Sequence, residues 1–186
     1  MNVRPTALPD VLEITPRRHG DGRGWFSETW NQRAWTAATG LDVSWVQDNE
    51  SFSALVGTVR GVHFQVDPTP QAKLVRVESG RILDVAVDLR RSSATYLMNV
   101  TFELSAERGN QLFIPEGFGH GFVTLEPNCL VAYKVSDFYD PATDRAISWR
   151  DPALNIDWGS SVDEATLSDK DASAPLLADL PHPPFG

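Results

Sequence analysis

The sequence predicts an all-β fold in which short strands form a β-sandwich or a closed barrel, decorated by a few short helices. The first observation is a two-residue alternation across residues 83–89 and 96–104, the pattern of strands that bury one face. The second is a series of apolar runs at 111–115, 121–125 and 129–135, separated by segments such as PEGFG and EPN. Many short strands at this spacing are typical of sandwiches and barrels.

Helical patterns are few in this chain. The best one covers residues 30–39, where Gly40 supplies a C-terminal stop, and a shorter turn is expected near residues 163–167. No repeat or shift in composition marks a boundary, so we expect one domain over residues 1–186. From about residue 172 the chain is expected to form an irregular tail, because LADLPHPPFG carries closely spaced prolines.

Composition limits the classes of function. The net charge of −9 argues against binding DNA or RNA through a broad basic surface, which needs many Lys and Arg contacts to phosphate. An anionic ligand would therefore need a few local positive partners. Cys129 is the single cysteine, so no intrachain disulfide can form and a reducing compartment is expected. No signal-peptide pattern and no stretch of about 18 apolar residues is present, so we expect a cytoplasmic protein that does not bind a membrane.

Two histidines lie in predicted strands, His63 in GTVRGVHFQ and His120 in IPEGFGHGF. A lone strand histidine is usually a core residue with satisfied hydrogen bonds. Pro115, Gly117 and His120, however, have the PxGxxH spacing that resembles the second motif of cupins, where the His points into a barrel. Metal-binding cupins carry an HxH pair in their first motif, and the matching sequence here is HFQ, with one imidazole. We therefore predict a jelly-roll, cupin-like β-barrel without a metal.

Without a metal, side chains must supply the acid and base chemistry. His63 can act as a general base if a carboxylate fixes its tautomer and stabilises its charged form. Asp171, in LSDKD, is a candidate for that carboxylate, and a solvated charge in a polar tail is the equal alternative. Tyr133 shares a strand face with Val131 and Val135, so it is either core filler or, opposite a histidine, a proton donor.

Positive side chains are the candidates for holding an anion. Lys73 begins the strand KLVRV; it can stabilise an oxyanion if it points inward, and otherwise it lies at the surface. Arg23 and Arg60 stand beside glycines, which let a backbone approach a pyrophosphate. Strict alternation places Arg60 and His63 on opposite strand faces. A shared site therefore requires a bulge or twist at Gly61, or a rim position for Arg60.

Taken together, the motifs resemble one family, the dTDP-4-dehydrorhamnose 3,5-epimerases of deoxysugar biosynthesis. The matching segments run in the family's order from Arg23 to Leu177. They are DGRGWFSE, QDNESFS, GTVRGVHFQ, QAKLVRVESGRILDVAVDLR, NQLFIPEGFGHGF, YKVSDFYDP, ISWRDPALNIDW and LSDKDASAPLL. The sequence departs from the family's usual residues at Val62, Phe64, Gly119 and Asp144, and the last of these shortens one expected substrate contact.

The resemblance implies a jelly-roll homodimer that exchanges an N-terminal strand, with no metal and no nicotinamide cofactor. It implies that His63, paired with Asp171, removes the proton next to the C4 ketone of a dTDP-linked 4-keto-6-deoxy sugar. Tyr133 would be the acid on the opposite face, and Lys73 would stabilise the enolate. The residues that the resemblance assigns to substrate binding are Arg23, Phe26, Glu28, Gln47, Asp48, Asn49, Arg60, His120, Tyr139, Asp144 and Lys170. Among them, Phe26 and Tyr139 are the candidates to stack on the base, although aromatic residues beside such turns are more often packing residues.

Three alternatives stay open at this point. A sister enzyme of the same fold would invert only C3 or only C5 of another deoxysugar. A cupin-like module would bind a nucleotide sugar without turnover. A metal-dependent cupin oxygenase or isomerase would contain stoichiometric iron, manganese or zinc, against the expectation from Gln65.

Overall fold

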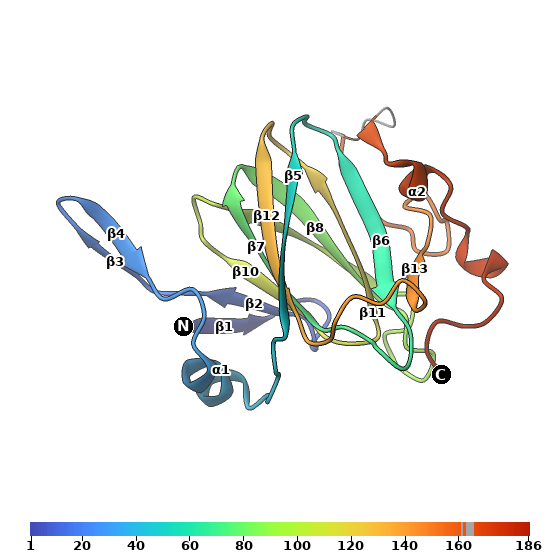
Figure 1. Ribbon diagram of the computed structural model, residues 1–186, viewed down its shortest axis with the longest axis horizontal. Coiled ribbons are helices and arrows are strands. Elements are labelled where there is room, and N and C mark those ends of the chain that lie inside the picture. Colours follow the sequence, from blue (N-terminus) through green and yellow to red (C-terminus); the bar gives the residue numbers. More distant parts are fainter. Residues whose placement is uncertain (161, 163–165) are drawn as a thin grey trace.

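The computed structural model describes residues 1–160, 162 and 166–186, and its main feature is a pair of antiparallel β-sheets that face each other (Figure 1). The larger sheet, in the order β1-β2-β10-β7-β12-β5, consists of β1 (Asn2–Pro5), β2 (Leu12–Thr15), β10 (Gln111–Ile114), β7 (Lys73–Ser79), β12 (Cys129–Val135) and β5 (Gln47–Ser53). The smaller sheet, in the order β13-β6-β11-β8-β9, consists of β13 (Asp144–Ala146), β6 (Val59–Gln65), β11 (Phe118–Thr124), β8 (Arg81–Asp88) and β9 (Asn99–Ser105). This arrangement confirms the predicted jelly roll.

The apolar core lies between the two sheets. Val75 and Val131 from the larger sheet pack in one cluster with Ile82 and Leu104 from the smaller sheet, and all four side chains are fully buried. Burial of such side chains is the main source of stability for a domain of this kind. Lys73 stands on the same face of β7 as Val75, as the alternation predicted. The space between the sheets therefore holds both the core and a polar region.

Each predicted strand is present, with differences at the ends. Strand β11 begins three residues earlier than expected, at Phe118. Strand β9 begins at Asn99 instead of residue 96. Because Leu97 has a φ of +62° and the N–H of Met98 bonds the carbonyl of Thr95, the chain turns there before it extends into the strand.

Strand β8 is buried on both faces, so the prediction that it buries one face was wrong. Val85 and Val87 pack in a second cluster outside the barrel, whereas Asp84 and Ala86, on the other face, are equally inaccessible to solvent. The reason lies in the chain after β13, which covers the outer face of the smaller sheet. The alternating residues of β8 therefore face two different buried environments, one apolar and one partly polar.

The helix predicted over residues 30–39 is α1 (Gln32–Thr39). It begins later because the Asn31 side chain accepts a hydrogen bond from the N–H of Ala34 at 3.0 Å and caps the helix. It ends at Gly40, whose φ of +72° confirms the predicted stop. Of the turn expected near 163–167, residues 163–165 lie outside the described residues.

Strands β3 (Arg18–Asp21) and β4 (Gly24–Ser27) form a two-stranded hairpin that projects from the body of the molecule (Figure 1). Trp25 and Phe26 near its tip are 59% and 71% exposed. The guanidinium of Arg18 lies 4.1 Å from the centroid of the Trp25 ring. We call residues 18–27 the arm.

The chain after β13 lies over the smaller sheet and ends in red at the lower right of Figure 1. Ile147, Leu154 and Trp158 pack in one cluster with Val85 and Val87. This segment contains α2 (Asp169–Ala172), and the tail after it contains one short 3-10 helix (Leu177–Asp179). Partly buried apolar residues of the tail contact the same cluster. Within the described parts of the chain, no helix is long and apolar enough to span a membrane.

Candidate active site

A cavity of about 540 Å³ opens between the two sheets, within the usual size range of small-ligand sites. Its walls come from β5, β6, β7, β11, β12 and β13, from the loop after β12 and from α2. The side chains that line it and that the sequence had singled out are Gln47, Asn49, Arg60, His63, Lys73, His120, Tyr133, Tyr139, Asp144 and Lys170. Although the chain carries a net charge of −9, the cavity gathers cationic groups, as expected for a small anion site.

The two walls of the cavity carry different proton-transfer groups. His63 on β6 and His120 on β11 are paired residues of the smaller sheet. Lys73 on β7 and Tyr133 on β12 belong to the larger sheet. Since the sheets face each other, an imidazole wall stands opposite a wall with an ammonium and a phenol. A ligand between them meets potential proton acceptors and donors on opposite sides.

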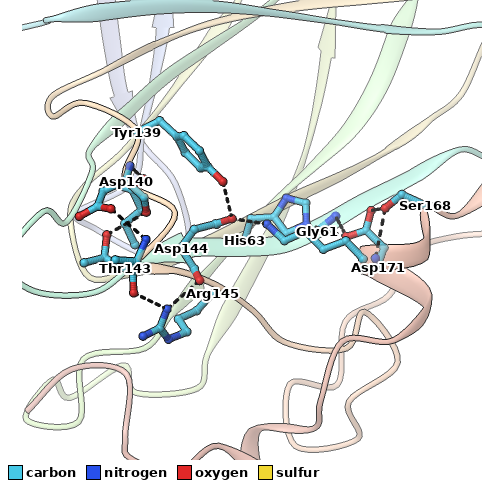
Figure 2. Close-up of polar contacts among 12 residues, drawn as sticks. Gly61, His63, Tyr139, Asp140, Thr143, Asp144, Arg145, Ser168 and Asp171 are labelled. Atoms are coloured by element: carbon cyan, nitrogen blue, oxygen red, sulfur yellow. Dashed lines mark hydrogen bonds and ion pairs between the residues drawn. The ribbon is translucent and has the colours of Figure 1, made fainter.

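His63 and Asp171, which are 108 residues apart in the sequence, form a close pair (Figure 2). Asp171 Oδ1 lies 2.6 Å from His63 Nε2, and Asp171 is 3% exposed. Burial opposes ionisation of this carboxyl, but hydrogen bonds from His63, Ser168 and the Gly61 N–H outweigh it and lower its pKa. The alternative that Asp171 is a solvated surface charge is therefore wrong. An ionised carboxylate beside His63 stabilises the protonated imidazole.

His120 has a partner that the sequence analysis missed. Its Nε2 lies 2.7 Å from Oδ1 of Asp84, which is completely buried on β8. Burial raises the pKa of Asp84, and the neighbouring His120 only partly offsets this shift. The available signal is an aspartate within an otherwise apolar strand, on the face that the alternation predicts to be exposed. A second histidine–carboxylate pair thus stands beside the first.

Tyr133 and Lys73 are both shielded from water. Burial is the main cause that raises the pKa of Tyr133 above its usual value, so its phenol is neutral at physiological pH. Lys73 is 8% exposed, and burial lowers its pKa to about 8 against the opposing charges of Asp144 and Asp84. Its Nζ lies 3.5 Å from the carbonyl oxygen of His63. The surface alternative for Lys73 is wrong, because the side chain points into the cavity.

Arg60 and His63 line one cavity because β6 contains a bulge. His63 pairs with His120 and Arg60 pairs with Phe122, so three steps along β6 match two along β11. Gly61 lies within this bulge, and a Cβ there would be 2.6 Å from the carbonyl oxygen of His120. Of the alternatives that the sequence left open, the structure shows the bulge at Gly61. Arg60 also bonds the Phe52 carbonyl at 2.9 Å on the opposite sheet.

The rim of the cavity is a chain of polar contacts (Figure 2). The hydroxyl of Tyr139 donates to Asp144 Oδ2 at 3.2 Å, and Lys170 Nζ contacts the same oxygen at 2.5 Å. The backbone N–H of Tyr139 donates to Gln47 at 3.1 Å. Tyr139 itself is 57% exposed, so its ring is available to a ligand at the mouth.

Gln65, which stands where an HxH motif would place its second histidine, anchors the loop that carries Tyr139. Its amide nitrogen donates to the carbonyls of Thr69 at 2.7 Å and of Phe138 at 3.1 Å. Its amide oxygen accepts from the N–H of Asp140 at 2.9 Å. Both backbone neighbours of Tyr139 are thus bonded to one buried side chain, so Gln65 has a structural role here.

We expect Gln65→Leu to lower the free energy of unfolding by about 2–4 kcal/mol, because it leaves several loop backbone groups unpaired. Thermal unfolding of this variant is the measurement. Gln71→Leu is the matched control, since Gln71 holds the same loop through one bond, to the carbonyl of Asp137 at 2.8 Å. An equal fall in Tm for the two variants would contradict the anchoring role.

Four predicted binding residues lie outside the cavity. Arg23, Phe26 and Glu28 belong to the arm and the segment just after it, and Arg23 pairs with Asp21 at 2.6 Å. Asp48 lies between Gln47 and Asn49 on β5 but points to the opposite face, where it pairs with Lys134 at 2.8 Å. Strand alternation separates Asp48 from its neighbours. Within one described chain, these four residues are not brought to the site.

Comparison with known proteins agrees with the predicted family. Residues 5–179 match the family described as dTDP-4-dehydrorhamnose 3,5-epimerase. The chain is 48% identical over 179 residues to the dTDP-4-dehydrorhamnose 3,5-epimerase of Pseudomonas aeruginosa. The aligned region covers 96% of this chain and 97% of that relative. The resemblance inferred from the motifs is therefore confirmed.

Two solved structures extend the similarity to three dimensions. The dTDP-6-deoxy-D-glucose-3,5-epimerase of Legionella pneumophila, in complex with dTDP-4-keto-L-rhamnose, is 40% identical with a TM-score of 0.89 and covers 96% of this chain and 94% of that one. A 3'-monoepimerase from Streptomyces bikiniensis, in complex with dTDP-quinovose, is 32% identical with a TM-score of 0.86. The match covers 94% of this chain and 87% of that one. Because the match in sequence and in fold spans nearly its whole length, the chain belongs to the dTDP-4-dehydrorhamnose 3,5-epimerase family, whose members are isomerases that act on carbohydrates.

Proposed function

We propose that this protein inverts C3 and C5 of dTDP-4-dehydro-6-deoxy-D-glucose by metal-free proton transfer, the epimerisation of dTDP-L-rhamnose biosynthesis. The observation that carries the proposal is the placement of His63 and Tyr133 on opposite walls of one cavity. Inversion at a carbon requires that a proton leave from one face and return to the other. A base and an acid on facing sheets meet this requirement.

The ketone at C4 acidifies the hydrogens on both neighbouring carbons. In the proposed reaction, the nitrogen of His63 that does not face Asp171 takes the proton, and the Asp171 carboxylate stabilises the resulting imidazolium. The Lys73 ammonium stabilises the negative charge on the enolate oxygen. This electrostatic interaction is strong because Lys73 is buried away from water. Tyr133, neutral in this environment, returns a proton from the other side. After His63 releases its proton to water and Tyr133 takes one up, the same pair of groups can serve the second carbon.

The pH dependence of the rate follows from Lys73. Its ammonium is charged below a pKa of about 8 and loses the charge as pH rises through that value, so kcat is expected to fall above about pH 8. Tyr133 remains protonated in this range because its pKa is raised. The check is a kcat profile from about pH 6 to about pH 10. In Lys73→Arg the cation persists, so an alkaline limb that stays near pH 8 in this variant would contradict the assignment.

The nucleotide part of the substrate is proposed to lie toward the mouth. Arg60, Lys170 and His120 are the local donors for the diphosphate oxygens, and the exposed ring of Tyr139 is the candidate to stack on the base. Asp144, where the family usually has a longer Glu, is proposed to act through its ion pair with Lys170. In this proposal, the residues that recognise the nucleotide are different from the two residues that transfer protons.

We also propose that two copies of the chain form a homodimer in which each arm contacts its partner. The exposure of Trp25 and Phe26 on a projecting hairpin supports this proposal, because more than half of each of these large side chains is open to solvent within one chain. Arg23 and Glu28 would then reach the site of the partner subunit. Light scattering after size-exclusion chromatography should give twice the mass of one chain, and Trp25→Ser with Phe26→Ser should reduce it. A monomer of undiminished activity would overturn the proposal.

The deciding experiment follows the C3 and C5 hydrogens by proton NMR. The protein, treated with a chelator, is incubated in deuterated water with dTDP-4-keto-6-deoxyglucose, and a downstream reductase traps the product. Loss of both signals is the expected result. Loss of one signal would instead indicate a single-carbon epimerase like the Streptomyces bikiniensis relative. Retention of both signals with chelated and with untreated protein would favour a nucleotide-sugar-binding module, whereas exchange seen only with untreated protein would revive a metal-dependent cupin.

A further inference from the structure

The Ser168 hydroxyl contacts Asp171 at two points, its buried carboxylate and its backbone N–H (Figure 2). Its hydroxyl donates to Oδ2 at 2.8 Å and accepts from the backbone N–H of Asp171 at 3.1 Å. The other oxygen, Oδ1, accepts from the N–H of Gly61 at 3.3 Å and lies 2.6 Å from His63 Nε2. One carboxylate oxygen therefore faces Ser168 while the other faces His63, and a rotation of the carboxylate would break both sets of contacts.

Ser168 also determines where the helix that carries Asp171 begins. It is the N-cap of α2, a helix of only four residues. A helix this short has little stability of its own, so its position depends on its cap and on contacts with the rest of the fold. The next contact along it is the ion pair of Lys170 with Asp144 at the rim. Removal of the Ser168 hydroxyl thus loosens Asp171 while the helix keeps its other attachment.

We infer that Ser168 is a positioning residue, which holds the Asp171 carboxylate in the orientation that supports His63. The inference rests on the proposed function, because it assigns Ser168 a part in the proton transfer by His63. Ser168 is not among the residues that line the cavity, so it acts through Asp171 and not on the substrate. Its loss should therefore lower kcat and leave KM nearly unchanged.

The test compares Ser168→Ala with Ser173→Ala in the hydrogen-exchange assay. Ser173 lies at the other end of α2 and donates to the carbonyl of Asp169 at 2.6 Å. It is the matched control, because it loses a hydroxyl from the same helix without affecting the carboxylate. We expect Ser168→Ala to lower kcat about tenfold, with KM within about twofold of the wild-type value, and Ser173→Ala to match the wild type. Ser168→Thr, which keeps the hydroxyl, should restore most of the rate.

Two further variants separate positioning from folding. Ser168→Gly removes the hydroxyl, but glycine is a tolerated N-cap, so this variant should fold and yet lose about as much kcat as Ser168→Ala. In an Asp171→Asn background, Ser168→Ala should change kcat by less than about twofold, because the group it positions is already altered. A wild-type rate in Ser168→Ala, or a second tenfold loss in the Asp171→Asn background, would overturn the inference. Absence of exchange in the wild-type protein would instead refute the proposed function, before any variant is compared.

Discussion

His63→Ala is expected to abolish hydrogen exchange at both C3 and C5, with a fall in rate of at least about 10³-fold. The reason is that His63 is the residue paired with the buried Asp171 carboxylate, and its ring borders the cavity at the face opposite Tyr133. Proton NMR in deuterated water reports both carbons in one experiment. His63 is partly exposed, so the fold should tolerate the change, and the thermal unfolding curve checks this.

His182→Ala is the control for His63→Ala. His182 lies exposed in the tail, away from the cavity lining, so its loss should leave exchange at the wild-type rate. Near wild-type turnover in His63→Ala would remove the proposed base. Loss of exchange at one carbon alone would show that a second group removes the other proton, and His120 with its Asp84 partner would be the first to test.

Tyr133→Phe is expected to separate exchange from inversion. The base remains, so hydrogen exchange should persist within about tenfold of the wild-type rate, whereas formation of the inverted product should fall by about 10²-fold or more. The substitution removes one hydroxyl and keeps the ring that packs against the core. The measurement compares solvent deuterium in recovered substrate with product trapped by a reductase.

The control for this variant is Tyr96→Phe. Tyr96 lies in the turn before β9 and is not among the residues that line the cavity, so both exchange and inversion should stay unchanged. If Tyr133→Phe reduces exchange and inversion by the same factor, Tyr133 does not have a distinct role as the acid. Its loss would then act on the binding of the substrate as a whole.

Local patterns were sufficient for the central strands of this fold and for the end of α1. Alternation placed Lys73 beside Val75 and Tyr133 beside Val131, and the structure keeps each pair on one strand face. Gly40 ended a helix because it tolerates a positive φ, which is a property of a single residue. The motifs also sufficed for the family, because they cover nearly the whole chain.

Alternation alone did not predict that both faces of β8 are buried. The alternation across residues 83–89 predicts one buried face and leaves the buried Asp84 on the other, because a period of two does not reveal what covers each face of a strand. The chain after β13 covers the outer face of β8, and the barrel interior encloses the inner one. Conversely, Asp48 follows Gln47 directly in sequence, yet the pleat of β5 turns it away from the cavity.

The sequence by itself determined the central strands, the C-terminal end of α1, the family and the residue types available for proton transfer. Only the tertiary structure decided which of them meet. Asp171 contacts His63, 108 residues away in the sequence, because α2 packs beside the β6 bulge. Arg60 and His63 line the same cavity because the extra residue in that bulge changes which strand face Arg60 occupies. Periodicity and capping are properties of neighbouring residues, whereas these contacts depend on the closure of two sheets and on the segment that covers them.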